Sequence, residues 1–313
     1  MASKDTPSQF GDYEVDRQVA RHACATWYSA SAQGGKSVAL AAQPESTAEE
    51  TARFDEEATK LEKLGHPNLA KVLGHGVDQG HLYLVEEAIP GGVQLSSLLQ
   101  QRRLSLPEAL RLLKGIALGV EFAHSSGLVH QHLDPSLVVV SEDLMVIKVR
   151  GFCLGLPPQQ SDLTVGTTRS AFSNLAYFAP EVASEKTDVT VQSNVYAIGV
   201  MFYEMLVGKV PRGRFGLPSQ ANAEIPSELD AFVLKCVEAE PRERFSSITK
   251  MLARLSAIED HLRLGLVHEL QGLRSGSRAS SEGGAGGSRW VVWAAIGLLV
   301  AVAIVVAVVL TRQ

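Results

Sequence analysis

The chain has 313 residues, a formal net charge of −5 at pH 7 and three cysteines. This length is enough to bury a full hydrophobic core, so we expect one domain with appendages. The mildly acidic balance argues against nucleic-acid binding. The cysteines, Cys24, Cys153 and Cys236, are odd in number and far apart in the sequence, which indicates reduced thiols and not a disulfide framework.

The N-terminal part of the chain predicts strands and one helix. Residues 1–12 contain no long apolar run, so we expect no signal peptide there and a disordered segment. Alternating apolar residues predict strands at 13–16, 37–40 and 81–85, and a Gly-Gly pair predicts a hairpin turn at 33–36. Residues 51–64 predict a helix with one apolar face, formed by Phe54, Ala58 and Leu61.

The following part of the chain is predicted to be helical. Ser105 and Glu108 fit a capping box that opens a helix. Apolar side chains then recur at helical spacing in three segments: Leu106, Leu110, Leu113, Ala117 and Val120; Val195, Ile198, Phe202 and Met205; Leu252, Leu255, Ile258 and Leu262. Residues 275–288 are rich in Gly and Ser and predict a flexible linker.

An uncharged apolar stretch, residues 290–310, lies near the end of the chain. As a helix rising ~1.5 Å per residue it spans ~30 Å, the thickness of the hydrocarbon core of a bilayer. Trp290 and Trp293 suit a membrane interface, and Arg289 and Arg312 flank the stretch. A buried core helix is the alternative, but such helices rarely run this long without polar residues. We therefore expect a single-pass tail anchor that leaves the preceding domain in the cytoplasm, on the inner membrane, with 311–313 as a short tail.

Several motifs follow one another in a fixed order along the chain. Residues 127–155 have the sequence GLVHQHLDPSLVVVSEDLMVIKVRGFCLG. The others are FDEEA at 54–58, HPNL at 66–69, LYLVEE at 82–87, YFAPE at 177–181, SNVYAIG at 193–199 and PRERF at 241–245. Together these motifs resemble the eukaryotic-type protein kinase domain, in the form found in bacterial membrane-anchored serine/threonine kinases, over roughly residues 13–260.

The resemblance implies an α+β, bilobal protein-kinase-like fold with one added C-terminal transmembrane helix. The kinase-like domain would span residues 13–265. Its small β-rich lobe would occupy about 13–88 and its larger helical lobe about 89–265. Residues 266–289 would form the end of a juxtamembrane helix and the Gly/Ser linker.

The resemblance also identifies positions where the family's reactive side chains are replaced. Phosphoryl transfer needs phosphates cradled by backbone N–H groups, charge neutralised by lysine and metal, and a positioned carboxylate. The glycine positions of the phosphate loop fall at Ala20, His22 and Ala25. The lysine, the catalytic aspartate, the lysine after it and the two metal ligands fall at Ala41, His132, Asp134, Leu137 and Gly151. We therefore predict a protein that is not an enzyme, binds neither ATP nor Mg²⁺ and has no metal site.

Two further residues are expected to alter the nucleotide pocket. Trp27 stands where the family has a valine over adenine, and its indole would fill the pocket; in a register shifted by one residue it would face solvent or the sheet. Glu86 stands at the gatekeeper position, where a buried carboxylate needs a partner. Arg150 or Lys148 would supply one, unless the strand end is open to water. His132 is a candidate base, and His130 is assigned to core packing, not to zinc binding.

The remaining matched residues are expected to support the scaffold. Leu61, His130 and Phe152 match the family's hydrophobic spine, and Glu181 and Arg244 match its structural ion pair. Glu57 matches the helix glutamate that pairs with the missing lysine. The region that matches the activation loop contains candidate phosphorylation sites, although an unmodified polar loop is an equal alternative: Thr164, Thr167, Thr168, Ser170 and Ser173.

These observations predict a pseudokinase that is attached to the membrane through residues 290–310 and acts as a scaffold or allosteric partner in bacterial signalling. Its protein partner would be an active kinase or a phosphopeptide-binding protein, and no nucleic acid is expected. Two alternatives are a divergent active serine/threonine kinase and a purely structural, membrane-associated binding protein.

Overall fold

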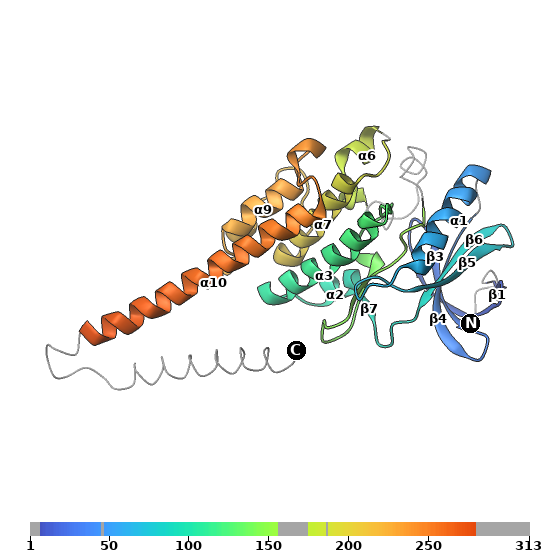
Figure 1. Cartoon of the computed structure of the whole chain (residues 1–313), viewed down its shortest axis with the longest axis horizontal. Coiled ribbons are helices and arrows are strands. Elements are labelled where there is room, and N and C mark those ends of the chain that lie inside the picture. Colours follow the sequence, from blue (N-terminus) through green and yellow to red (C-terminus); the bar gives the residue numbers. More distant parts are fainter. Residues whose placement is uncertain (1–6, 45–46, 156–174, 186, 280–313) are drawn as a thin grey trace. The chain divides into compact units, whose positions relative to one another are not determined.

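The computed structural model describes residues 7–44, 47–155, 175–185 and 187–279. The chain divides into two compact units, Met1–Ile258 and Glu259–Gln313. The first unit contains a lobe built on a β-sheet and a lobe built of helices (Figure 1). This is the bilobal α+β arrangement that the sequence predicts.

The sheet of the first lobe is antiparallel, with the strand order β1-β2-β3-β4-β6-β5. Its strands are β1 (Gln9–Phe10), β2 (Tyr13–Arg21), β3 (Thr26–Ala32), β4 (Lys36–Pro44), β5 (Val72–Asp78) and β6 (His81–Glu87). Phe10 is fully buried beside Tyr28 and Tyr83, with ring centroids 5.9 and 6.0 Å away. The expected disorder of residues 1–12 is therefore wrong for residues 7–12, because burying an aromatic ring offsets the entropy lost on ordering the strand.

Helix α1 (Ala48–Lys63) lies against the sheet beside β5 (Figure 1). A capping box between Thr47 and Glu50 begins the helix three residues before the predicted start. The predicted face of Phe54, Ala58 and Leu61 is buried. His75 on β5 links the strand to the helix, because its two ring nitrogens lie 2.7 Å from Glu62 and 3.2 Å from Asp55.

The second lobe combines helices with a small sheet of order β7-β8-β9. The helix α3 begins at the predicted capping box of Ser105 and Glu108. The elements before residue 156 are β7 (Val93–Gln94), α2 (Leu95–Gln101), α3 (Leu106–Ser125), β8 (Val138–Val140) and β9 (Ile147–Val149). The helices after residue 174 are α6 (Pro180–Glu185), α7 (Val191–Val207), α8 (Pro218–Ala221), α9 (Glu228–Cys236) and α10 (Ile248–Ala279).

Asn68, in the connection between α1 and β5, joins the two lobes. Its carbonyl oxygen accepts from the N–H of Val149 at 2.9 Å, and its side-chain Nδ2 donates to the carbonyl of Ile147 at 2.9 Å. Gly119 of α3 packs against the same residue, since a Cβ added there would lie 2.5 Å from the Asn68 carbonyl oxygen. The close approach of α3 thus depends on a residue without a side chain.

Helix α10 extends beyond the first unit and ends at Ala279. The linker predicted over residues 275–288 is therefore wrong for 275–279, where the helix continues. Among the residues that the structure describes, no helix is long and apolar enough to cross a bilayer. The predicted transmembrane segment 290–310 lies outside them.

Candidate functional site

The loop between α3 and β8 carries the predicted catalytic positions, and Asn194 of α7 fixes its start. The amide Nδ2 of Asn194 donates to the carbonyl of His130 at 2.8 Å, and the N–H of His130 donates to Asn194 Oδ1 at 3.0 Å. The His130 ring lies 4.5 Å from the Phe152 ring, centroid to centroid, and its Nε2 donates to the carbonyl of Arg150 at 3.0 Å. Burial lowers the pKa of His130 to about 3, so this imidazole is a neutral packing group.

Apolar groups fill the positions where the family has its lysine and metal ligands. Ala41 on β4 and Leu137 are fully buried. Gly151 adopts a left-handed backbone conformation, and a Cβ there would lie 3.5 Å from Leu137 and 3.4 Å from the Trp27 ring. Within the described ranges, no cluster of His, Cys, Asp and Glu side chains is suited to hold a metal ion. The side chains at these positions therefore do not fit a bound Mg²⁺, and we derive no step through one.

Trp27 lies on β3, with its ring next to Gly151. It pairs with Ala41 across β3 and β4 and is fully buried. The guanidinium of Arg150 lies 3.9 Å from the centroid of its ring, which is a close cation–π contact. The alternative of a solvent-facing Trp27 is therefore wrong, and the indole fills the space next to Gly151.

Glu86 lies on β6 with only 2% of its surface exposed. Its Oε1 accepts a hydrogen bond from the N–H of Gly151 at 2.9 Å. Burial raises the pKa of Glu86 to about 7, although the charge of Arg150 opposes the rise. Lys148 instead pairs with Glu87 at 2.6 Å. Of the alternatives left open by the sequence, Arg150 is thus the basic group that acts on Glu86, and the strand end is closed to water.

His22 and Asp134 form a contact that sequence reasoning missed. Both were interpreted only as positions where a kinase residue is absent. In the structure, Nε2 of His22 lies 2.6 Å from Oδ2 of Asp134, and both side chains are buried. The turn around His22 closes through its N–H, which donates to the carbonyl of Ala25 at 2.9 Å, while Ala20 lies on β2. The β2–β3 turn is thereby tied to the catalytic loop, across the place where kinases hold phosphates.

His132 lies beside this contact and is nearly buried. Its ring packs edge-on against Phe178 at 5.1 Å and lies 6.0 Å from the His22 ring. Glu57 lies on α1, and the residue at the family's lysine position is the buried Ala41. Burial raises the pKa of Glu57, as expected for a carboxyl group that lacks a strong cationic partner.

The predicted ion pair of Glu181 and Arg244 is present in the second lobe. The guanidinium donates to both carboxylate oxygens of Glu181 at 2.7 Å. It also donates to three backbone carbonyls, those of Glu238, Gln192 and Ala239. Burial opposes ionisation of Glu181, but Arg244 outweighs it and lowers the pKa of the carboxyl group. This pair therefore anchors α6 to the body of the lobe.

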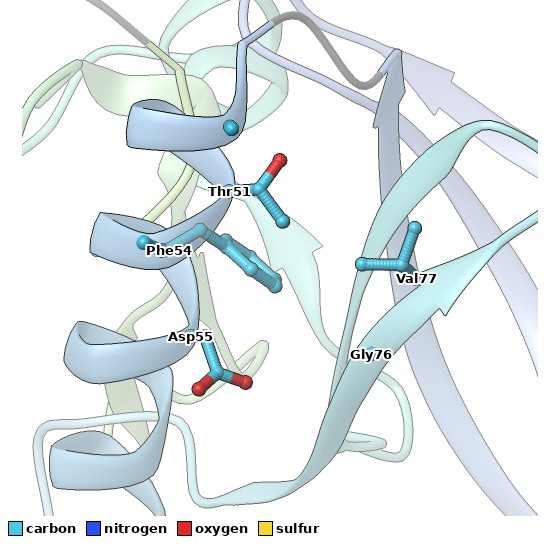
Figure 2. A pocket seen from close by; sticks show the side chains of 7 residues that line it. Thr51, Phe54, Asp55, Gly76 and Val77 are labelled. Atoms are coloured by element: carbon cyan, nitrogen blue, oxygen red, sulfur yellow. The ribbon is translucent and has the colours of Figure 1, made fainter.

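The candidate phosphorylation sites Thr164, Thr167 and Thr168, with Ser170 and Ser173, lie outside the described residues. A separate cavity of about 410 Å³ lies between α1 and β5. Figure 2 shows Thr51, Phe54 and Asp55 of the helix facing Val77 across it. None of the predicted site residues lines this cavity, so it is separate from the site around Trp27 and Glu86.

Comparison with known proteins identifies the family. A model described as protein tyrosine and serine/threonine kinase matches residues 18–255. The probable serine/threonine-protein kinase PknB of Lactococcus lactis is 29% identical over 215 residues, which cover 64% of this chain and 34% of the relative. The serine/threonine-protein kinase PrkC of Bacillus subtilis is 26% identical over 226 residues, covering 68% and 34%. The chain thus spans about a third of the length of these relatives.

Solved structures share the fold. The PknI kinase domain of Mycobacterium tuberculosis matches with a TM-score of 0.64 at 21% identity, covering 80% of this chain and 99% of that domain. A structure of Rad53 in complex with AMP-PNP matches with a TM-score of 0.60 at 22% identity, covering 77% and 64%. These likenesses support the bilobal fold.

These comparisons contradict two predictions. The chain was expected not to be an enzyme, yet the relatives that it matches are named serine/threonine-protein kinases. ATP and Mg²⁺ were expected not to bind, yet the family consists of kinases and one structural neighbour holds AMP-PNP. Both predictions are corrected. Both rested on the replaced motif residues alone, whereas the match to the family extends over residues 18–255.

Proposed function

The chain belongs to the protein tyrosine and serine/threonine kinase family, and we propose that it is a divergent serine/threonine-protein kinase whose cleft is closed by its own side chains. The observation that carries the proposal is the burial of Trp27 beneath Arg150, inside a bilobal kinase-like fold. The names of the relatives support the activity. In this proposal Trp27 must leave its site before a nucleotide enters.

His132 would accept the proton of the substrate hydroxyl, since it occupies the position of the family's catalytic aspartate. Histidine is the side chain used most often as a general base. The ring lies in the catalytic loop between Phe178 and the β2–β3 turn. Opening of that turn would expose it, so the same movement would admit the nucleotide and uncover the base.

We further propose that residues 290–310 attach the chain to the inner membrane in a single pass, with the kinase-like domain in the cytoplasm. The uncharged sequence and its flanking arginines support this attachment. The protein would act in bacterial signalling beside a second kinase or a phosphopeptide-binding protein. The threonines at 164, 167 and 168 would be the modified residues that such a partner reads.

Phosphoryl transfer and nucleotide binding, measured on the full chain in detergent, test the proposal. We expect weak transfer from radiolabelled ATP to an acceptor protein in the parent. Trp27→Val, which introduces the family's residue, should increase both nucleotide affinity and transfer. His132→Ala in the Trp27→Val background should abolish transfer, while Met145→Ala, at an exposed position, should change nothing. If neither the parent nor Trp27→Val transfers phosphate, the proposal is refuted.

A further inference from the structure

The β2–β3 turn carries a thiol, an imidazole and a carboxylate in a row. The Sγ atom of Cys24 lies 2.8 Å from Nδ1 of His22. On the opposite side of the ring, Nε2 of His22 lies 2.6 Å from Oδ2 of Asp134. The other carboxylate oxygen of Asp134 is fixed by Ser136, whose N–H and hydroxyl donate to it at 2.7 and 2.6 Å. The carboxylate therefore orients the imidazole, and the imidazole faces the sulfur.

This arrangement suits proton transfer and not metal binding. Both ring nitrogens of His22 are engaged, and they point in opposite directions, so the sulfur and the carboxylate cannot share one ion through this ring. A thiol next to a base that a third group orients is the arrangement that activates a cysteine nucleophile. Burial alone would lower the pKa of His22, but Cys24 and Asp134 raise it to about 10, so the ring can hold the proton that the Cys24 thiol gives up.

The three cysteines of the chain differ in their surroundings. Cys24 is 7% exposed, whereas Cys153 and Cys236 are 1% and 0% exposed. Burial raises the pKa of both Cys153 and Cys236 well above the ordinary value, so these two thiols are inert. Two basic side chains, His22 and Arg150, interact with Cys24. Burial lowers the pKa of Arg150, and the charges of Glu86 and Cys24 only partly oppose this fall.

We propose that Cys24, with His22 and Asp134 as positioning residues, is a reactive-thiol site that takes hydroperoxides. The thiol proton passes to His22, and the sulfur attacks one oxygen of the peroxide. The S–O bond forms as the O–O bond breaks, and the leaving oxygen takes the proton from His22 to give water or an alcohol. The sulfur is oxidised by two electrons to a sulfenic acid, and the peroxide is reduced by two. The site needs no kinase activity and goes beyond the proposed function.

The oxidised sulfur would no longer fit the closed turn. A Cβ added at Gly155 would lie 2.6 Å from Cβ of Cys24 and 2.5 Å from the His132 ring, so Gly155 packs closely against the Cβ of Cys24. Gly155 is itself held, because its N–H donates to Gln43 at 2.6 Å and its carbonyl accepts from Arg53 at 3.2 Å. An added oxygen therefore pushes the turn away from the catalytic loop and separates His22 from Asp134.

The test measures each cysteine separately in the full chain in detergent. Hydrogen peroxide is added with dimedone, which traps sulfenic acids, and labelling is followed by mass spectrometry at pH 7. An ordinary thiol is only a few per cent thiolate at this pH, so an activated Cys24 should be labelled on the order of tenfold faster or more than a normal thiol. Cys153 and Cys236 serve as internal controls and should be labelled slowest.

Two variants separate activation from simple exposure. His22→Ala and Asp134→Asn should each slow the labelling of Cys24. Both rates should be followed between about pH 6 and pH 8, where removing the base should change how steeply the labelling of Cys24 depends on pH. The proposal is overturned if Cys24 reacts no faster than Cys153 and Cys236. It is also overturned if both variants keep the parent's rate and pH profile.

Discussion

Replacing Arg244 with alanine removes the most heavily bonded side chain described above. The guanidinium makes two hydrogen bonds of 2.7 Å to Glu181 and three more to backbone carbonyls. After the change, Glu181, whose side chain is 12% exposed, keeps the hydroxyl of Ser193 as a partner. Removing one member of a buried ion pair costs about 3–5 kcal/mol. We expect the free energy of unfolding to fall by this amount.

Urea unfolding followed by circular dichroism measures the loss. With a slope of about 3 kcal/mol per M, the midpoint should move down by roughly 1–2 M. The matched control is Arg242→Ala, which removes an arginine whose side chain is 82% exposed and lies 3.9 Å from Glu243. Its effect should stay within about 0.5 kcal/mol. Equal midpoints for the two variants at pH 7 would refute the assignment of Arg244 as the anchor of α6.

The pH dependence of the same variant gives a second check. Arg244 lowers the pKa of Glu181 below that of the unfolded chain. The pair therefore stabilises the fold above the ordinary glutamate pKa, and this contribution is lost as the pH falls through the lowered pKa. The difference in stability between the parent and Arg244→Ala should shrink in acid. A difference that stays constant down to the lowest pH at which the parent folds would contradict the ion-pair mechanism.

Two further predictions concern the buried carboxyl group of Glu86 and the packing of Gly119 against Asn68. Because burial raises the pKa of Glu86 from 4.5 to about 7, the parent should lose stability as the pH rises through this interval. Glu86→Gln should remove up to about 3 kcal/mol of that loss at pH 8. The exposed control Glu142→Gln should lose stability with pH as the parent does. Urea midpoints at pH 5 and pH 8 measure the loss in each protein. Gly119→Ala places a Cβ 2.5 Å from the Asn68 carbonyl oxygen and should cost about 1–3 kcal/mol. Gly65→Ala, where a Cβ meets nothing within 4 Å, should change stability by less than about 1 kcal/mol, so similar melting temperatures for the two alanine variants would count against the close packing of α3.

Local patterns in the sequence located most of the regular elements. The capping box of Ser105 and Glu108 and the apolar face of α1 depend on residues three or four positions apart, so they are visible in a short window. Phe10 was missed because a single aromatic residue in a polar segment has no periodicity. Its burial depends on Tyr28 and Tyr83, which are distant in the chain.

In the candidate site, a contact between two motif residues could be predicted from the sequence, whereas a contact between two replaced residues could not. Glu181 and Arg244 are 63 positions apart, and their pairing was expected only because both residues match a family motif. His22 and Asp134 are 112 positions apart, and neither is the residue that the family has at its position. The resemblance stated what was missing at these two positions, but it carried no information on what the new side chains contact. The contacts that join Cys24, His22 and Asp134 could therefore be found only in the structure.

Asn194 has a consequence for how this sequence can change. An ionised aspartate at this position would offer only acceptor oxygens and no donor. Here the amide donates to the His130 carbonyl at 2.8 Å, and its oxygen lies within hydrogen-bond distance of two nitrogens, the His130 backbone N–H and Nε2 of His124. Asn194→Asp would set a carboxylate oxygen against that carbonyl and leave it without its donor, at a cost of about 1–3 kcal/mol. Asn194 therefore cannot be exchanged for aspartate without a change in the backbone of the catalytic loop.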